Sequence, residues 1–145
     1  MKKVQEVANM LVEGIKFTID LPERHGDGRV PMLDLSVWME DREGSRVICH
    51  SYYEKPTTSP LVFHGRGACS TKQKITILSE EVKRRLYNQD KLHSIKERET
   101  ELERFSKKMI DSSYTSEVRR EILVSGIKRY YRMRLMEVSG VRSLY

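Results

Sequence analysis

Residues 33–59 read LDLSVWMEDREGSRVICHSYYEKPTTS and contain two runs in which apolar and polar residues alternate. The first run covers residues 33–40, and the second covers residues 47–55. Alternation with a period of two residues is typical of strands that bury one face. The polar, glycine-containing segment 41–45 between the runs is typical of a hairpin turn. These residues therefore predict an antiparallel β-hairpin.

The residues upstream of this hairpin extend the same pattern. A third alternating run lies at residues 15–21, and the polar, glycine-bearing segment 23–29 follows it as a loop. Ahead of this run, residues 4–12 carry apolar side chains at helical spacing, namely Val4, Val7, Ala8 and Leu11. The N-terminal part of the chain is therefore predicted to be a short helix followed by a small antiparallel sheet.

Downstream of the sheet the apolar period becomes helical. Ser70 or Thr71 can cap a first helix that stops at residues 88–90, with Ile75, Leu78, Val82 and Leu86 as its apolar positions. A second helix is predicted from about residue 95 to residue 110, and a third begins at Thr115 or Ser116 and ends before Ser139. The fold class is therefore α+β, with a small antiparallel sheet or hairpin followed by a three-helix bundle.

Length and composition limit the classes of protein to which the chain can belong. Its 145 residues suffice for one compact domain or for two small subdomains. No apolar run approaches the roughly 20 residues that span a bilayer, and no signal-like hydrophobic segment follows the N-terminus. We therefore expect no membrane partner and an intracellular location, either nuclear or cytoplasmic. Cys49 and Cys69 are expected to be free thiols.

Basic charge is concentrated in the C-terminal half. Residues 1–70 contain nine Lys and Arg against ten Asp and Glu, whereas residues 71–145 contain eighteen against eleven. Such asymmetry favours a polyanionic partner, above all nucleic acid. The alternative is that the basic helices merely have solvated faces.

Two clusters of basic residues are candidates for nucleic-acid binding. The first comprises Lys72, Lys74, Lys83, Arg84 and Arg85. The second comprises Arg119, Arg120, Lys128, Arg129, Arg132 and Arg134, interleaved with Tyr130 and Tyr131. Arginine forks suit phosphate oxygens, and tyrosine rings can lie against sugars or bases. The alternative is that Tyr130 packs in the core while the arginines extend along the surface.

No catalytic centre or metal site is recognisable in the sequence. The four histidines show no ligand spacing among themselves or with the cysteines. No set of carboxylates suggests the convergence that two-metal phosphoryl transfer requires. We therefore predict no catalytic residue, no metal ligand and no cofactor in this chain.

Three short segments occur in a particular order along the chain. They are Gly14-Ile15-Lys16-Phe17-Thr18-Ile19, Pro31-Met32-Leu33-Asp34-Leu35 and Ser51-Tyr52-Tyr53-Glu54-Lys55-Pro56-Thr57. In this order they resemble reverse transcriptases, in particular those of Penelope-like and related retroelements, over roughly residues 12–135. The resemblance implies a distal-palm-like helix and strands at residues 1–60, a connector at 61–70, a thumb-like helical subdomain at 71–138 and a tail at 139–145.

The resemblance also implies roles for residues near the hairpin. It places the hairpin beside the primer grip, where Tyr53 and Lys55 would share one side of the strand and Lys55 could contact a phosphate. The alternative is that Lys55 is a strand-end lysine lying over Tyr53. The parent family is an RNA-directed DNA polymerase that uses a divalent metal, Mg²⁺, but its Tyr-x-Asp-Asp turn and its further upstream Asp are missing here.

The expected function follows from this partial resemblance. We expect a reverse-transcriptase fragment that binds an RNA–DNA or DNA duplex through its basic helices, with the missing palm and fingers supplied by a longer chain or a partner. The main alternative is a free-standing nucleic-acid-binding or protein-assembly module without polymerase activity. An unrelated enzyme with a site shared across a homodimer and a truncated product without function are further alternatives.

Overall fold

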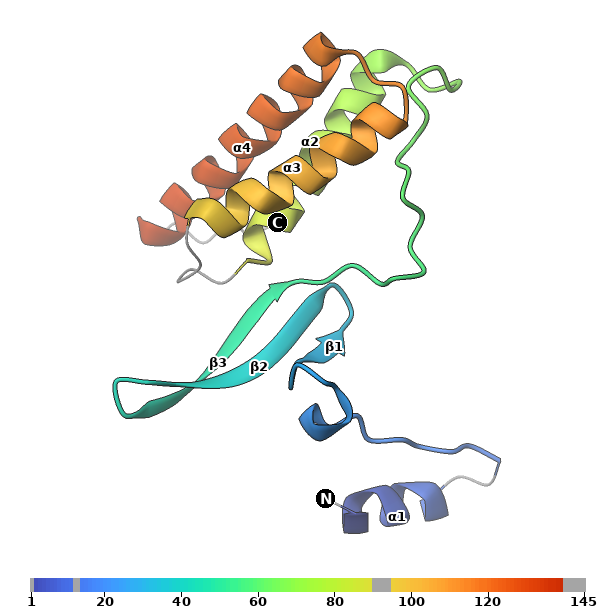
Figure 1. Cartoon of the computed structure of the whole chain (residues 1–145), viewed down its shortest axis with the longest axis vertical. Helices are drawn as coiled ribbons and strands as arrows, with labels where there is room; N and C mark the ends of the chain where they lie inside the picture. The colour runs from blue at the N-terminus through green and yellow to red at the C-terminus, as the bar shows by residue number, and fades with distance from the viewer. Residues whose placement is uncertain (1, 12–13, 90–94, 140–145) are drawn as a thin grey trace.

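The chain forms helices at both ends of a small sheet, and the computed structural model describes residues 2–11, 14–89 and 95–139. In chain order the elements are α1 (Lys2–Leu11), a 3₁₀ turn (Pro22–Arg24), β1 (Val30–Met32), β2 (Leu35–Arg42), β3 (Ser45–Tyr52), α2 (Thr71–Tyr87), α3 (Ile95–Asp111) and α4 (Ser116–Val138). Figure 1 shows α2, α3 and α4 side by side as a bundle, with the sheet below them and α1 farthest away. The predicted α+β class is confirmed.

The sheet is antiparallel throughout, with the strand order β1-β2-β3. β2 and β3 meet at a two-residue turn of Glu43 and Gly44, both with positive φ, so that Arg42 pairs with Ser45. Such a turn suits a hairpin, because its twist matches that of the strands. Both strands therefore lie closer to the turn than predicted. β2 covers residues 35–42 instead of 33–40, and β3 covers residues 45–52 instead of 47–55.

The alternating run at residues 15–21 is not a strand, and the prediction there is wrong. The N–H of Phe17 donates to Asn9 Oδ1 at 2.5 Å, and its carbonyl accepts from Gln5 Nε2 at 3.0 Å. The segment thus lies against α1 through side-chain hydrogen bonds and has no ladder partner among the described residues. The third strand is β1 instead, which pairs with the start of β2. The predicted helix at 4–12 begins earlier, at Lys2, and Val12 lies outside the described residues.

The bundle helices begin and end close to the predicted positions. The Ser70 side chain accepts from the Gln73 N–H while the Gln73 side chain accepts from the Ser70 N–H, which is a capping box at the start of α2. The Thr115 side chain accepts from the Val118 N–H at the start of α4. Asn88 caps the end of α2. Asp90, the last residue of the predicted stop, and residues 140–145 of the predicted tail lie outside the described residues.

The hydrophobic core lies within the bundle and the turn between α3 and α4. Its buried side chains are those of Leu78, Val82, Leu86, Phe105, Met109, Tyr114, Ile122 and Tyr130. α2 and α4 approach closely at Gly126, where an added Cβ would lie 2.4 Å from Val82 Cβ and 2.8 Å from the Ser79 carbonyl oxygen. Tyr130 belongs to this core. Its ring is therefore packed inside the bundle, which was the alternative to a contact with nucleic acid.

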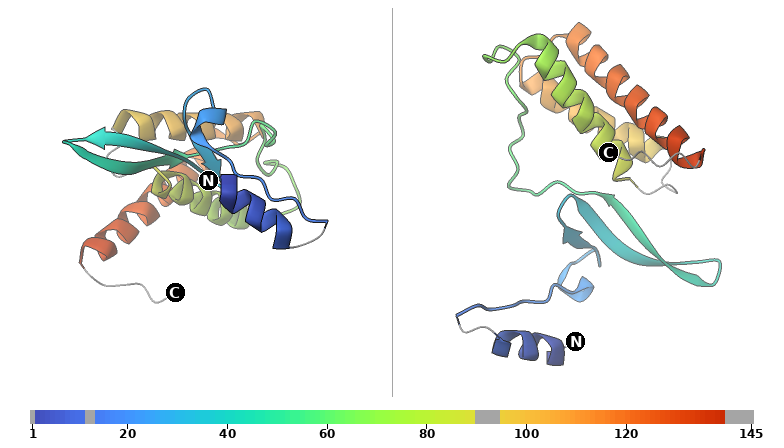
Figure 2. Two further views of the ribbon diagram at one scale, coloured as in Figure 1. Left: turned by 90° about the horizontal axis from the view of Figure 1, so that it is seen from below. Right: turned by 180° about the vertical axis from the view of Figure 1, so that it is seen from behind.

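The sheet contributes no side chain to this core. Its apolar face carries Met32, Met39 and Ile48, which are exposed, and Leu35 and Val37, which are half-buried. In both views of Figure 2 the β2–β3 hairpin projects away from the bundle. The face that the alternation predicted to be buried is therefore half-buried at the bundle end and exposed toward the hairpin turn, at Met39 and Ile48.

Two further expectations bear on the class of protein. Among the described residues no helix has the length and apolar character needed to cross a membrane. Both cysteines are free thiols as predicted, with Cys49 buried and Cys69 exposed.

Candidate functional site

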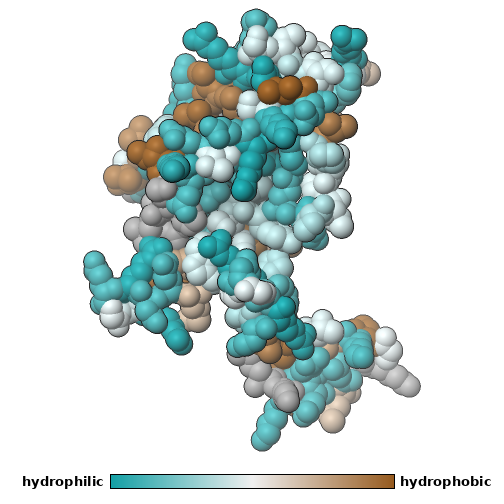
Figure 3. All heavy atoms as spheres, in the orientation of Figure 1, coloured by the Kyte–Doolittle hydropathy of each residue, from teal (hydrophilic) through white to brown (hydrophobic). Residues whose placement is uncertain are grey.

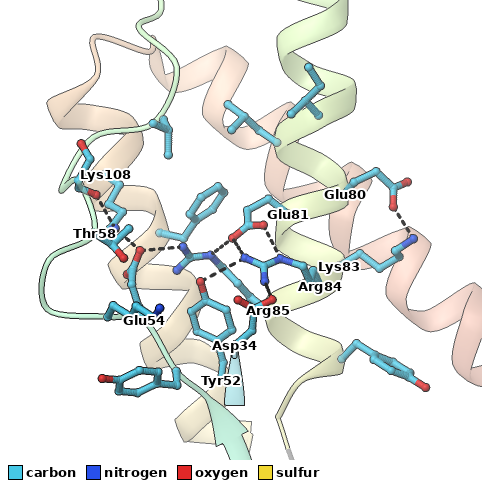
Figure 4. Close-up of a pocket in the computed structure, with 18 of the residues that line it drawn as sticks. Asp34, Tyr52, Glu54, Thr58, Glu80, Glu81, Lys83, Arg84, Arg85 and Lys108 are labelled. Carbon is cyan, nitrogen blue, oxygen red and sulfur yellow. Dashed lines mark hydrogen bonds and ion pairs between the residues drawn. The ribbon is translucent and has the colours of Figure 1, made fainter. Parts of the chain in front are cut away.

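A cavity of about 920 Å³ lies between the end of β3, the segment that follows it and α2. Figure 4 shows the side chains that line it. One part of the lining is apolar and includes Leu61, Phe63, Ile77, Tyr87 and Met133. A second part of the lining, here named the charged wall, contains Asp34, Glu54, Glu81, Arg84, Arg85 and Lys108.

Arg85 lies at the centre of the charged wall and is only 4% exposed. Its Nε donates to Glu81 at 2.7 Å, and its Nη1 donates to Glu101 at 2.6 Å. Its third nitrogen, Nη2, lies 3.4 Å from the Glu54 carboxylate. A buried guanidinium requires such compensation, because an unpaired charge in the protein interior is strongly unfavourable.

Arg84 connects the same helix to the sheet. Its guanidinium donates twice to Glu81, at 2.7 and 2.8 Å, and also to the Asp34 carboxylate in the turn between β1 and β2. Its Nη2 lies 3.4 Å from the Tyr52 hydroxyl. The hydrogen bond with Glu81 is the main reason that the pKa of Arg84 is raised. Arg84 is therefore held between one carboxylate of the bundle and one of the sheet.

The two bundle carboxylates around Arg85 respond to burial in opposite ways. Burial disfavours the ionised form of Glu81, but the hydrogen bonds from Arg84 and Arg85 outweigh it, so the pKa of Glu81 is lowered. Burial raises the pKa of Glu101, and the hydrogen bond from Arg85 offsets only part of that effect. Burial likewise raises the pKa of Tyr52.

α3 adds one more cation to the charged wall. Lys108 Nζ donates to the Glu54 carboxylate and, at 3.2 Å, to the carbonyl oxygen of Ser59. The segment that leaves β3 is therefore bound to α3 at two points, five residues apart in the chain.

The first predicted basic cluster lies largely in or beside this wall. Arg85 and Lys74 are buried, and Lys74 Nζ donates to the carbonyl oxygens of Gly65 and Gly67 at 2.8 and 2.7 Å. Lys83 pairs with Glu80. In this conformation Lys74, Arg84 and Arg85 bind groups of their own chain. Lys72, by contrast, is exposed and has no ion pair with any described residue.

The second predicted cluster, on α4, is divided in the same way. Arg129 pairs with Glu80 at 2.6 Å, and Arg134 pairs with Glu137 at 3.0 Å. Arg119 is half-buried. The three remaining cations are exposed and form no ion pair with the residues that the structure describes: Arg120, Lys128 and Arg132.

Tyr53 and Lys55 lie just beyond β3 rather than inside it. The Tyr53 N–H still donates to the Asp34 carbonyl oxygen at 2.7 Å, so the ladder extends one residue past the strand. Both side chains line the cavity, and Lys55 is exposed. The alternate residues Tyr52 and Glu54 are the ones that contact the helices.

Several partners in this site were not identified from the sequence: Asp34, Tyr52, Glu54, Glu81 and Glu101. The pairs of Glu81 with Arg84 and Arg85 could have been found from the sequence spacing, because residues three and four apart on a helix are neighbours. No such spacing could reveal the pair of Arg84 with Asp34, since fifty residues separate the two in the chain.

The carboxylates of the site do not fit the metal pair that reverse transcriptases, the family that the chain resembles, would use. No group of three or more His, Cys, Asp or Glu side chains converges on a possible ion position within residues 2–11, 14–89 and 95–139. In the charged wall each carboxylate is hydrogen-bonded to an Arg or Lys instead.

Comparisons of the chain with protein-family models, with curated proteins and with solved structures give no significant match. The likeness to reverse transcriptases therefore rests on the three quoted segments and their order.

Proposed function

We propose that this chain is the distal-palm and thumb part of a retroelement reverse transcriptase, and that it binds a template–primer duplex through phosphate contacts. The order of sheet, connector and three-helix bundle is the arrangement that the resemblance implies. Phosphate contacts position a duplex without reading its sequence, so little sequence preference is expected. The proposal places the protein inside the cell, in the nucleus or cytoplasm.

The observation that carries the proposal is a set of cations on α4 that form no ion pair with any described residue. Arg120, Lys128 and Arg132 are exposed, and the exposed ring of Tyr131 lies among them in the helical sequence. At 100° per residue the three cations span roughly 120° of the helix circumference. Cations without a carboxylate partner can release counterions from a phosphate backbone, whereas the paired Arg129 and Arg134 would first have to exchange partners.

Polymerisation would require the missing palm and fingers. Exposed apolar surfaces are typical of contact sites, and two of those among the described residues lie outside the bundle. One is the sheet face with Met39 and Ile48, and the other is α1 with Val4 and Leu11. Both support a role inside a larger assembly, in which Mg²⁺ would be bound by residues of the missing parts.

The test is binding to a labelled RNA–DNA duplex across a salt series from about 50 mM to about 500 mM. The variant Arg120→Ala/Lys128→Ala/Arg132→Ala should bind at least about tenfold more weakly at low salt. Its log–log salt slope should decrease by roughly 0.9 for each phosphate that the variant no longer neutralises. The matched control, Lys96→Ala/Arg104→Ala/Lys107→Ala, removes the same charge from exposed positions of α3 and should bind almost normally.

Two results would overturn the proposal. One is the absence of binding at low salt by a folded, monodisperse protein. The other is an equal loss of affinity in both triple variants, which would indicate a response to net charge instead of to the α4 face.

The protein-assembly alternative is favoured by a different feature of α4. Exposed apolar side chains recur at helical intervals along it: Val124, Tyr131, Leu135 and Val138. Figure 3 shows hydrophobic patches on the helical part of an otherwise mostly hydrophilic face. If this stripe mediates self-association, Tyr131→Ser/Leu135→Ser should convert an oligomer to a monomer in sedimentation analysis. A monomeric wild-type chain would exclude self-association through this stripe.

A further inference from the structure

The hairpin is joined to the bundle through polar side chains. Asp34 accepts from Arg84, Glu54 lies against Arg85 and Lys108, and the Tyr52 ring centroid lies 4.6 Å from the Arg85 guanidinium carbon. The sheet has no side chain in the hydrophobic core. The orientation of the hairpin therefore depends on charge–charge and cation–π contacts (Figure 4) and on a hydrogen bond at 3.2 Å from His50 Nδ1 to the carbonyl oxygen of Asn88, at the end of α2.

These contacts form an inner and an outer set. The inner partners of Arg85 are Glu81 and Glu101, which both belong to the bundle, and the Arg85 and Glu101 side chains are 4% and 7% exposed. The outer partners belong to the sheet and the residues after it, and in the Arg84–Asp34 pair the side chains are 38% and 54% exposed. Loss of the outer partners would leave Arg85 with two carboxylates, so no buried charge would become uncompensated.

We propose that these outer contacts form a releasable polar latch between the hairpin and the bundle. Its members are Asp34, Tyr52 and Glu54 on the sheet side and Arg84, Arg85 and Lys108 on the bundle side. At low ionic strength the latch holds the hairpin against α2. Because salt screens partly exposed ion pairs far more than buried ones, high salt releases the hairpin while both parts stay folded.

The movement has a defined pivot, because the connector that follows is bound to the bundle. The Val62 N–H donates to Ser112 Oγ at 2.9 Å, and the Gly65 N–H donates to the Ser112 carbonyl oxygen at 2.7 Å. Lys74 holds the carbonyl oxygens of Gly65 and Gly67 from the other side. Release of the latch therefore lets the hairpin swing about residues 55–61, without unfolding the connector.

A distance measurement between two spin labels tests the latch. One label is attached to Cys69, which is exposed, and the other to a cysteine introduced by Ser45→Cys at the hairpin turn. Cys49 is buried and stays unlabelled. At about 50 mM salt we expect one narrow distance distribution, and at about 1 M salt a broad one. The variant Asp34→Asn/Glu54→Gln, which keeps the side-chain shapes, should give the broad distribution at low salt.

The matched control is Glu80→Gln. Glu80 is also a carboxylate on the surface of α2, but it pairs with Lys83 and Arg129 inside the bundle. This variant should keep the narrow distribution at low salt. Helical circular dichroism should be unchanged in all the proteins.

Three outcomes would overturn the proposal. A narrow distribution in Asp34→Asn/Glu54→Gln would mean that other contacts orient the hairpin. A broad distribution in the wild type at low salt, or in Glu80→Gln, would mean that no specific latch exists. A loss of helical signal in Asp34→Asn/Glu54→Gln would mean that the hairpin and bundle do not remain folded independently.

Discussion

The guanidinium carbon of Arg85 lies 4.6 Å from the ring centroid of Tyr52, so a cation of α2 covers the last residue of β3. A second ring, that of Phe105, lies at the same 4.6 Å within the bundle. Burial opposes the charge of Arg85, but Tyr52 and the hydrogen bond with Glu81 outweigh it and raise the pKa of Arg85. This residue therefore stays charged at a position where most cations would not be tolerated.

Removal of Arg85 should leave a buried carboxylate without its main partner. We expect Arg85→Met to lower the free energy of unfolding by about 3–5 kcal/mol, because Glu101 is buried beside it. The double variant Arg85→Met/Glu101→Met should recover part of this loss, since two apolar side chains replace the pair. Urea denaturation of both variants measures the difference. A double variant less stable than Arg85→Met would contradict this account of the pair.

Lys74 and Lys72 provide a matched comparison on one helix. Lys74→Met removes the ammonium that binds two connector carbonyls, and we expect a loss of about 1–3 kcal/mol with faster amide exchange at Gly65 and Gly67. Lys72→Met changes an exposed lysine without an ion pair among the described residues, and it should change stability by less than about 0.5 kcal/mol. Equal effects of the two substitutions would show that the carbonyl contacts of Lys74 are unimportant.

The stability of the chain should depend on acid through Glu81. Because the pKa of Glu81 is lowered in the folded protein from its ordinary value of 4.5, the unfolded chain binds more protons below that pH. The contribution of Glu81 is present above about pH 4.5 and is lost as the pH falls through its folded pKa. Glu81→Gln should therefore flatten the fall in unfolding free energy below about pH 4.5, as measured by denaturation at several pH values.

Glu101 is the opposite case and serves as the comparison. Its raised folded pKa means that stability declines as the pH rises from about 4.5 through that folded value. Glu101→Gln should remove this decline in stability. It should not change the loss of stability below about pH 4.5 that Glu81 produces. Parallel pH profiles for the wild type and both variants would contradict the assignments.

Gly126 sets how closely α2 and α4 can approach. In Gly126→Ala the new Cβ would meet Val82 Cβ at 2.4 Å and the Ser79 carbonyl oxygen at 2.8 Å, so the helices must separate. We expect a net loss of about 1–3 kcal/mol despite the better helix propensity of alanine. Ser125→Ala, on the neighbouring position of the same helix, is the control. A lower melting temperature only for Gly126→Ala would confirm the prediction.

The helices were predictable because their signals are local. The side chains of Ser70 and Gln73 form a capping box within one turn, and the Thr115 side chain caps α4 by accepting from the Val118 N–H. The strands were less predictable, because alternation cannot distinguish a ladder from an extended segment. At Phe17 the side chains of α1 take the hydrogen bonds that a strand partner would need.

The basic clusters illustrate a second limit. A count of charges does not show which cations have carboxylate partners in space. Arg85 and Glu101 are sixteen residues apart, and Arg84 and Asp34 are fifty apart, so neither pair has a sequence signal. The count locates the excess of basic residues in the C-terminal half. Only the structure separates Lys128, which is exposed and has no ion pair with a described residue, from the buried Arg85.

The position of Trp38 gives the two parts of the chain different optical reporters. It is the single tryptophan, it lies in β2, and the Arg29 guanidinium carbon sits 4.1 Å from its ring centroid. Its fluorescence therefore follows the melting of the sheet, whereas far-ultraviolet ellipticity follows mainly the long helices. Because the core contains no strand residue, thermal denaturation should change the emission at a lower temperature than the ellipticity. An unmodified chain thus reports separately on each of its two parts.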